Sequence, residues 1–115
     1  MVFGAIGARS RHLRFFRDAL LQLSEDLTIG PVCAFDAPEL IPELAGFRLC
    51  STPEEAIAQA DAVLLLPREG YLHAPAAEFA LRSGKPVFVD KPFTCDPAQA
   101  AALAALSCET GTPCT

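Results

Sequence analysis

The fold of this chain is decided by the stretch GKPVFVDKPF, which occupies residues 84–93. A glycine of the kind that ends helices precedes a short apolar run, residues 86–89, which has the length of one strand. A continuously apolar strand is typical of a parallel sheet with both faces covered, and such sheets bind ligands at the carboxyl ends of their strands. Asp90 and Lys91 are therefore predicted to face a ligand crevice. The alternative is a surface salt bridge in an ordinary strand-to-helix loop.

Apolar runs of strand length alternate with helical patterns along the rest of the chain. Strands are expected at residues 2–6, 29–35, 47–50, 62–66 and 87–89, and helices at residues 10–23, 38–44, 53–61, 73–83 and 97–108; a further strand would begin at 112–115. This alternation indicates β-α-β units. The predicted fold class is therefore α/β, with a three-layer, Rossmann-like, doubly wound and mostly parallel sheet of about five strands.

Local sequence signals set two of these boundaries. Gly30 and Pro31 weaken the second strand, so we expect it to begin only at Val32 or to have an irregular entry. Thr52 is suited to cap the next helix, and the glutamate three residues later, Glu55, is placed to reach back to the cap in a capping box.

Length and composition limit the class of protein. A chain of 115 residues suits one domain, residues 1–115, and is too short for a cofactor domain with a separate substrate domain. Apolar residues make up 51%, which indicates a globular chain, yet no apolar run is long enough to cross a bilayer. The net charge of −5 argues against nucleic acid or an anionic membrane as the main partner, because phosphate backbones require a basic face.

The N-terminus and the cysteines bear on location. Residues 1–6 show neither the basic leader nor the cleavage region of a signal peptide, so they are expected to form the first strand of a cytoplasmic protein. The five cysteines are odd in number and lack the paired spacing of a zinc site. We interpret them as reduced thiols.

A glycine-bearing turn follows the first predicted strand, where dinucleotide-binding loops occur. Only Gly7 matches the pattern G-x-G-x-x-G, because Arg9 and His12 stand where the second and third glycines would be. Arg9 and Arg11 either contact phosphate directly or are solvated residues of the first helical turn, and the sequence leaves both readings open. The candidate contacts in this loop are Gly7, Ala8, Arg9, Ser10 and Arg11.

Asp36 follows the second predicted strand, from which a carboxylate can accept hydrogen bonds from both hydroxyls of an adenosine ribose. This position favours NAD over NADP, since a carboxylate repels a 2′-phosphate, unless Arg9 or Arg11 reverses that preference. The alternative is an aspartate that caps or forms the turn before Ala37 and Pro38.

The strand at 62–66 ends at the same predicted edge of the sheet. Leu66, Pro67 and His73, at the start of the next helix, are therefore further candidate contacts. A lone histidine at a helix start is otherwise a cap or a partly exposed surface group.

Taken in order, these features resemble the Gfo/Idh/MocA oxidoreductases, the family of glucose-fructose oxidoreductase and inositol dehydrogenase. The most specific part is residues 61–93, which end in Asp90-Lys91-Pro92 where the family has Glu-Lys-Pro. The resemblance implies that Lys91 lies beside the nicotinamide and helps to bind or protonate the substrate oxygen, as the catalytic residue. It also implies cofactor contacts from Asp90 and Pro92.

The cofactor implied by the resemblance is NAD, with NADP as the alternative. Family members bind substrate on a following domain that nothing in these 115 residues matches, so the C-terminal catalytic domain is expected to be absent and the chain's own enzymatic activity is left open. The first hypothesis is an NAD(P)-binding domain, occurring as a separated, truncated or independently encoded piece, that needs another chain or the missing half of the enzyme to turn over. A homo-oligomer or a partner chain that supplies a substrate domain is part of this expectation. The alternatives are a non-catalytic Rossmann-like interaction module that has lost the dinucleotide and, less favoured, a small CoA-binding protein.

Overall fold

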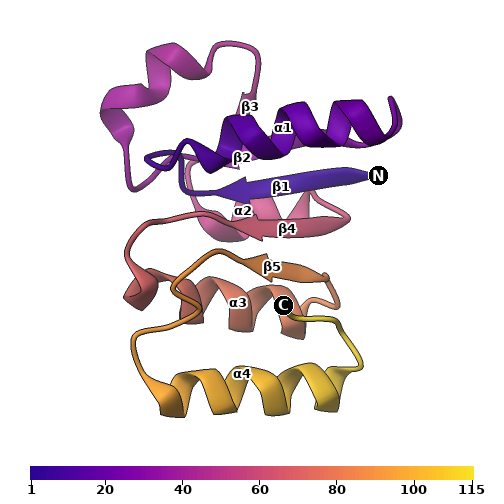
Figure 1. Ribbon diagram of the computed structural model, residues 1–115, viewed down its shortest axis with the longest axis vertical. Coiled ribbons are helices and arrows are strands. Elements are labelled where there is room, and N and C mark those ends of the chain that lie inside the picture. The colour runs from indigo at the N-terminus through magenta and orange to yellow at the C-terminus, as the bar shows by residue number, and fades with distance from the viewer.

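Five parallel strands form one sheet through the middle of the computed structural model, which describes residues 1–115 (Figure 1). The strands are β1 (Val2–Ile6), β2 (Thr28–Cys33), β3 (Arg48–Leu49), β4 (Ala62–Leu65) and β5 (Val87–Val89), in the order β3-β2-β1-β4-β5. The strand β1 pairs with β2 on one side and with β4 on the other. The order therefore reverses between β1 and β4, which is where open sheets of this kind bind ligands.

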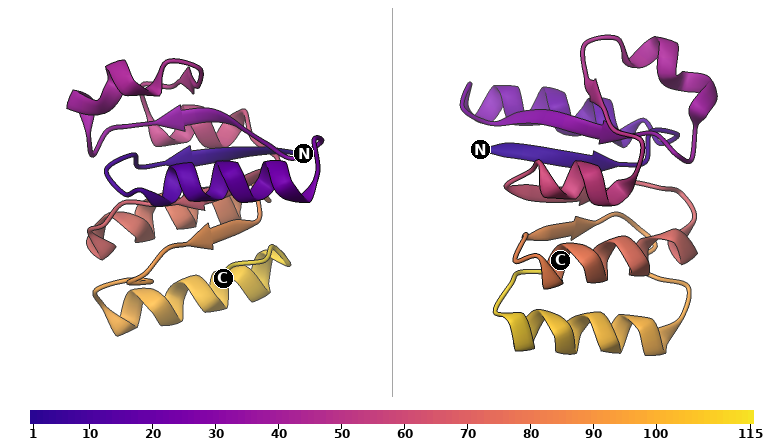
Figure 2. Two further views of the ribbon diagram at one scale, coloured as in Figure 1. Left: turned by 45° about the horizontal axis from the view of Figure 1, so that its top comes forward. Right: turned by 180° about the vertical axis from the view of Figure 1, so that it is seen from behind.

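Helices cover both faces of this sheet. They are α1 (His12–Leu23), α2 (Pro53–Ala58), α3 (His73–Arg82) and α4 (Pro97–Thr110), with the short 3-10 helices η1 (Pro38–Leu44) and η2 (Gly70–Leu72). One core cluster joins α1 and η1 to Ala5 and Leu64, and the other joins α2 and α3 to Ile6 and Leu65. The view from behind in Figure 2 shows α2 and α3 over the face opposite α1, with α4 beyond α3. The predicted doubly wound α/β class is confirmed, and the sheet is entirely parallel.

Buried residues mark β4 as an interior strand of the sheet, between β1 and β5. All four of its residues are buried, and neighbours along the strand enter different clusters: Val63 and Leu65 pack towards α2 and α3, whereas Leu64 packs towards α1. A strand with both faces covered has no polar side, so a continuous apolar run is required there.

Several predicted boundaries need correction. The helix α1 begins at His12 and not at Ser10, whose hydroxyl instead accepts a hydrogen bond from the His12 amide at 3.1 Å. The strand β2 includes Gly30 and Pro31, with a register shift against β1 that confirms the irregular entry, and it ends at Cys33. The edge strand β3 shortens to two residues.

The helix caps follow the sequence with one difference. The Thr52 hydroxyl accepts from the Glu55 amide at 3.2 Å, as predicted, but the Glu55 carboxylate accepts from the Ser51 amide at 2.9 Å and not from the cap residue itself. The helix α2 ends at Ala58, before Asp61, whose carboxylate accepts from the Val2 amide at 2.8 Å. The helix α4 runs two residues further than expected, to Thr110.

The segment after α4 lies along the outer edge of β5. Cys114 forms an isolated parallel bridge with Val87, and the Val89 amide donates to the Thr115 carbonyl at 2.7 Å. The strand predicted at 112–115 is thus present only as a bridge. All five cysteines are free thiols. None of the helices has the length and apolar character that crossing a membrane demands.

Candidate functional site

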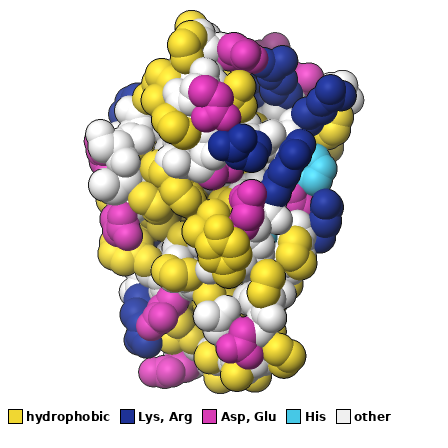
Figure 3. Space-filling view, turned by 90° about the vertical axis from the view of Figure 1, so that its left-hand side faces the viewer, with side chains coloured by type: hydrophobic (Ala, Val, Ile, Leu, Met, Phe, Trp, Pro, Cys, Tyr) yellow, Lys and Arg dark blue, Asp and Glu magenta, His cyan; other side chains and the backbone are white.

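Four loops meet at the carboxyl edge of the sheet, because all five strands run in the same direction. They follow β1, β2, β4 and β5, and they carry every residue that the sequence nominates for a site except His73. Figure 3 looks onto this edge and shows several Lys and Arg side chains gathered beside a histidine. In a chain with a net charge of −5, such a gathering marks this edge as different from the rest of the surface.

Gly7 allows the loop after β1 to press against the end of β4. Its φ angle is 91°, and a Cβ added there would lie 2.6 Å from the Pro67 nitrogen. The Gly7 amide also donates to the Cys33 carbonyl at 2.8 Å, which ties the loop to β2. Only glycine meets both requirements, since a side chain would be strained by the angle and would overlap Pro67. Leu66 and Pro67 themselves are fully buried behind this loop and support it from below.

Asp36 joins the loop after β2 to the loop after β1. Its carboxylate accepts hydrogen bonds from the amides of Ala8 at 2.8 Å and Arg9 at 3.3 Å. The following 3-10 helix has Ala37 at its N-cap and no side chain bonded there, so the alternative role of Asp36 as a cap is not the one observed. The two amides fix the carboxylate beside the loop, where its remaining lone pairs can accept from hydroxyl groups.

The side chain of Arg9 folds over this junction. Its Nε donates to the Asp36 carbonyl at 2.9 Å, its Nη2 contacts the same oxygen, and its Nη1 lies 3.0 Å from a carboxylate oxygen of Glu39. The structure thus places the Arg9 guanidinium, which is partly exposed, against Asp36 and Glu39, and its contact with phosphate stays a prediction. Its charge is matched by a carboxylate of this protein.

Three other cations surround a cavity of about 530 Å³, which we call the cationic cavity. It is lined by Ser10, Arg11, His12, Phe15, Arg68, Asp90 and Lys91. Arg11, Arg68 and Lys91 form no ion pair, whereas Arg9, Arg14, Arg17 and Arg82 each pair with a carboxylate. Unpaired cations around one hollow favour an anionic ligand there.

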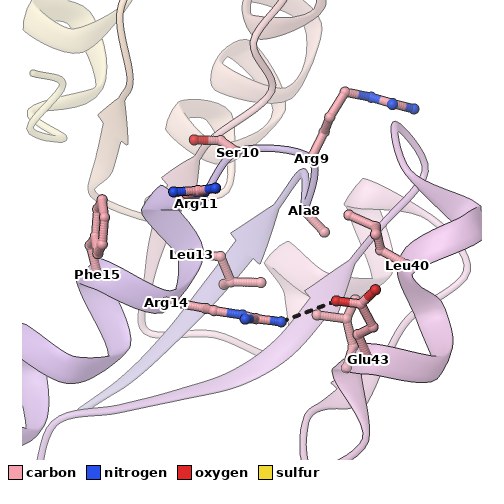
Figure 4. A pocket seen from close by; sticks show the side chains of 10 residues that line it. Ala8, Arg9, Ser10, Arg11, Leu13, Arg14, Phe15, Leu40 and Glu43 are labelled. Atoms are coloured by element: carbon pink, nitrogen blue, oxygen red, sulfur yellow. Dashed lines mark hydrogen bonds and ion pairs between the residues drawn. The ribbon is translucent and has the colours of Figure 1, made fainter.

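A second cavity of about 500 Å³ lies between α1 and η1 (Figure 4). It shares Ser10, Arg11 and Phe15 with the cationic cavity, so the two hollows adjoin along the start of α1. Figure 4 shows Arg14 reaching Glu43 across this second cavity, at 3.2 Å, while Arg9 extends away from that pair. An elongated ligand can therefore follow the edge from η1 towards β5.

Asp90 is held by a residue that sequence reasoning missed. One of its carboxylate oxygens contacts Nδ1 of His12, and the other accepts from the Lys91 amide at 2.8 Å. Asp90 is only 8% exposed, so both contacts matter for its solvation. The two side chains are 78 residues apart, and no local pattern indicates their pairing beyond the position of His12 at the start of a helix after β1.

His73 does not reach the surface. Its ring is 0% exposed, Nε2 lies 2.8 Å from the Pro67 carbonyl, and Nδ1 lies 2.9 Å from the Pro92 carbonyl. This geometry corrects the predicted contact between His73 and a ligand, because both ring nitrogens are already occupied. The ring instead links the loop after β4 to the loop after β5 and positions Pro92, which is itself exposed.

The cysteine at the end of β2, Cys33, is not a nucleophile. Burial is the main cause that raises the pKa of the Cys33 thiol above its ordinary value of 9.0, so it stays protonated at neutral pH. No group of three His, Cys, Asp or Glu side chains is arranged to hold a metal ion. The chemistry available at this edge is therefore that of a guanidinium, ammonium, carboxylate and amide site.

Comparison with known proteins agrees with this geometry. A family model described as "Oxidoreductase family, NAD-binding Rossmann fold" matches residues 2–115. None of the curated protein sequences compared with the chain matches it significantly.

Solved structures resemble the chain along its whole length. A Klebsiella pneumoniae protein assigned as an oxidoreductase is 29% identical with a TM-score of 0.80, over 100% of this chain and 33% of its own. A variant of KijD10, a 3-ketoreductase from Actinomadura kijaniata solved with TDP-benzene and NADP, is 27% identical with a TM-score of 0.78, over 99% of this chain and 36% of its own. The chain thus spans about a third of the length of these relatives.

Proposed function

The chain belongs to the Gfo/Idh/MocA oxidoreductase family, and we propose that residues 1–115 form a domain that binds NAD(H) across the carboxyl edge of the sheet. The observation that carries this proposal is the cationic cavity at the point where the strand order reverses. Two of its three unpaired cations, Arg11 and Arg68, supply the charge that the two phosphates of a dinucleotide require, and the third, Lys91, is left for the chemistry at the nicotinamide end.

The residues at this edge fit such a cofactor in type and position. Asp36 offers a carboxylate, fixed by two amides, to the hydroxyls of the adenosine ribose. Gly7 lets the backbone approach closely, and Ala8, Ser10 and Arg11 follow it into the first turn of α1.

Lys91 is the proposed catalytic residue. When bound, the nicotinamide supplies hydride transfer to or from a substrate carbon. The Lys91 ammonium lines the cationic cavity and would stabilise negative charge on the substrate oxygen, giving or taking its proton. Asp90, through its bond to the Lys91 amide, orients the backbone that carries this side chain.

The substrate site is proposed to be completed by protein segments outside residues 1–115. This follows from the share of its relatives that the chain spans, about a third. A cytoplasmic location is part of the same proposal.

One observation favours a second function, a Rossmann-like interaction module without a dinucleotide. Arg9 stands where a glycine would allow phosphates to approach, and its side chain is bound by Asp36 and Glu39. If the loop holds no nucleotide, this closed arrangement would be its permanent state.

Thermal unfolding with added ligand separates the two functions. We expect NAD⁺ and NADH to raise the melting temperature, because a ligand that binds only the folded state stabilises it by about 1.4 kcal/mol at ten times its Kd. For a domain of this size that corresponds to about 5 °C or more. CoA at the same concentration should have no effect.

The matched variants are Asp36→Asn and Asp26→Asn. With Asp36→Asn, the concentration of NAD⁺ needed for the same rise in melting temperature should increase at least tenfold. The control Asp26→Asn, in the loop that joins α1 to β2, should leave that concentration unchanged. No response of the unmodified protein to either nucleotide would support the interaction module instead.

A further inference from the structure

Two glutamates of η1 each hold an arginine, but only one of these pairs touches Asp36. Glu39 pairs with Arg9 at 3.0 Å, and Glu43 pairs with Arg14 at 3.2 Å. Arg14 makes no hydrogen bond to Asp36, whereas Arg9 binds the backbone oxygen of Asp36 through Nε and Nη2. The charge on Glu39 therefore acts directly at the end of β2.

The groups at this end of the sheet carry an unbalanced charge. Asp36 and Glu39 contribute two carboxylates, and Arg9 contributes one guanidinium that both residues engage. All three side chains stay in contact with solvent, with Arg9 41% and Glu39 54% exposed. A group that binds beside Asp36 thus meets a net negative charge, and the cation that contacts Asp36, Arg9, is already paired.

We propose that Glu39, by holding Arg9, selects NAD(H) against NADP(H); this inference rests on the proposed function. The two coenzymes differ by a phosphate on the adenosine ribose, at the hydroxyl group that Asp36 would accept from. Such a phosphate carries about −1.5 to −2 charges at neutral pH. Arginine is the side chain suited to bind it, through two parallel hydrogen bonds, and Glu39 keeps Arg9 from doing so.

The variant Glu39→Gln removes one negative charge and releases one side of the guanidinium while keeping the shape of the side chain. Because the site is open to solvent, we expect the affinity for NADP⁺ to rise by about three- to tenfold. The affinity for NAD⁺ should change less than twofold, since its ribose carries no charge. The gain for NADP⁺ should shrink at 0.5 M salt.

Two further variants test the route through Arg9. The double variant Arg9→Gln/Glu39→Gln should lose the gain for NADP⁺, because no guanidinium is left to release. Glu78→Gln removes a glutamate that also pairs with an arginine, Arg82 at 2.9 Å, but on α3. It should leave both affinities as they are.

Calorimetric titration of each protein with NAD⁺ and NADP⁺ measures the two affinities and tests the role of Glu39. Three results would each overturn the role of Glu39 while leaving NAD(H) binding intact. The Glu39→Gln variant could change both affinities equally, it could leave the affinity for NADP⁺ unchanged, or the double variant could keep the gain for NADP⁺ without Arg9. An unmodified protein that binds neither coenzyme overturns the proposed function and this inference with it.

Discussion

The two halves of the carboxyl edge differ in how their charges are satisfied. Beside β2, the Asp36 carboxylate accepts from two backbone amides, and the Arg9 guanidinium contacts the Glu39 carboxylate and the Asp36 carbonyl, so each charged group has a partner within the protein. Around the cationic cavity, beside β1, β4 and β5, Arg11, Arg68 and Lys91 have none, and the loop after β4 also holds the unpartnered oxygen of Glu69. Charges that are already paired can orient and select a ligand, whereas unpaired charges can bind it.

This difference also explains why the degenerate glycine loop does not exclude a nucleotide. A loop with three glycines binds phosphates through its amides and the positive end of the helix. Here two of those amides, from Ala8 and Arg9, are taken by Asp36. The side chains of Arg11 and Arg68 then provide the charge that the amides no longer offer.

The largest effect on the free energy of unfolding is expected at Gly7, where the loop after β1 contacts the end of β4. Gly7→Ala should lower the free energy of unfolding by about 3 kcal/mol or more, because the new Cβ meets both an unfavourable φ angle and the Pro67 nitrogen. Gly84→Ala is the matched control, since Gly84 has a φ of 68° but no neighbour within 4 Å. It should cost about 1 kcal/mol. Equal losses in urea denaturation would show that the contact with Pro67 contributes nothing.

Removal of an unpaired cation should weaken cofactor binding next. Arg68→Gln is expected to raise the Kd for NAD⁺ about tenfold, because a hydrogen bond between charged groups contributes about 1.5 kcal/mol. Arg48→Gln removes an exposed arginine of β3 that also lacks an ion pair but lies outside both cavities. It should leave the Kd unchanged. If the two variants weaken binding equally, only the overall charge matters and the cationic cavity is not the phosphate site.

Most of the fold could be predicted from the sequence, because its signals are local. The continuous apolar run of β4 and the cap at Thr52 act within a few residues, and both appear where expected. The start of α1 was wrong by two residues, since Ser10 bonds to His12 across the turn and nothing in the helical spacing marks that bond.

The site was less predictable, since its key contacts join distant residues. The residue types at the strand ends indicated which edge binds a ligand, and Asp36 lies there as predicted. The hydrogen-bonding partners of these side chains could not be predicted, however. His12 and Asp90 are 78 residues apart, and His73 contacts carbonyl oxygens 6 and 19 residues away. Such pairs depend on the order of the strands and not on any local pattern.

The contact between Asp90 and His12 tests, with a smaller expected effect, the difference between the two halves of the carboxyl edge. Asp90 is the one carboxylate that lines the cationic cavity, and it is held by His12 and the Lys91 amide. We expect His12→Ala to cost about 1–2 kcal/mol in the free energy of unfolding, because it leaves a buried carboxylate with one partner. A double-mutant cycle with Asp90→Asn measures the coupling. Strictly additive losses would mean that the two side chains do not stabilise each other.

The smallest effect at neutral pH is the one that two buried thiols, Cys33 and Cys50, have on the free energy of unfolding. It should be absent at pH 7. Burial, as the first cause, raises the pKa of both Cys33 and Cys50 above the ordinary 9.0. The folded state therefore keeps its thiol protons at a pH where the unfolded chain has lost them, so stability falls as the pH rises above about 9. Urea denaturation from pH 7 to 10 should show this decline, and Cys33→Ala should make it shallower by up to about 1.4 kcal/mol per pH unit.

A thiol reagent added at pH 8 tests the same burial. It should modify the exposed Cys95 and Cys108 well before Cys33 and Cys50. Rapid modification of Cys33 in the folded protein would show instead that the end of β2 opens to solvent, and that the paired half of the edge is no more closed than the other.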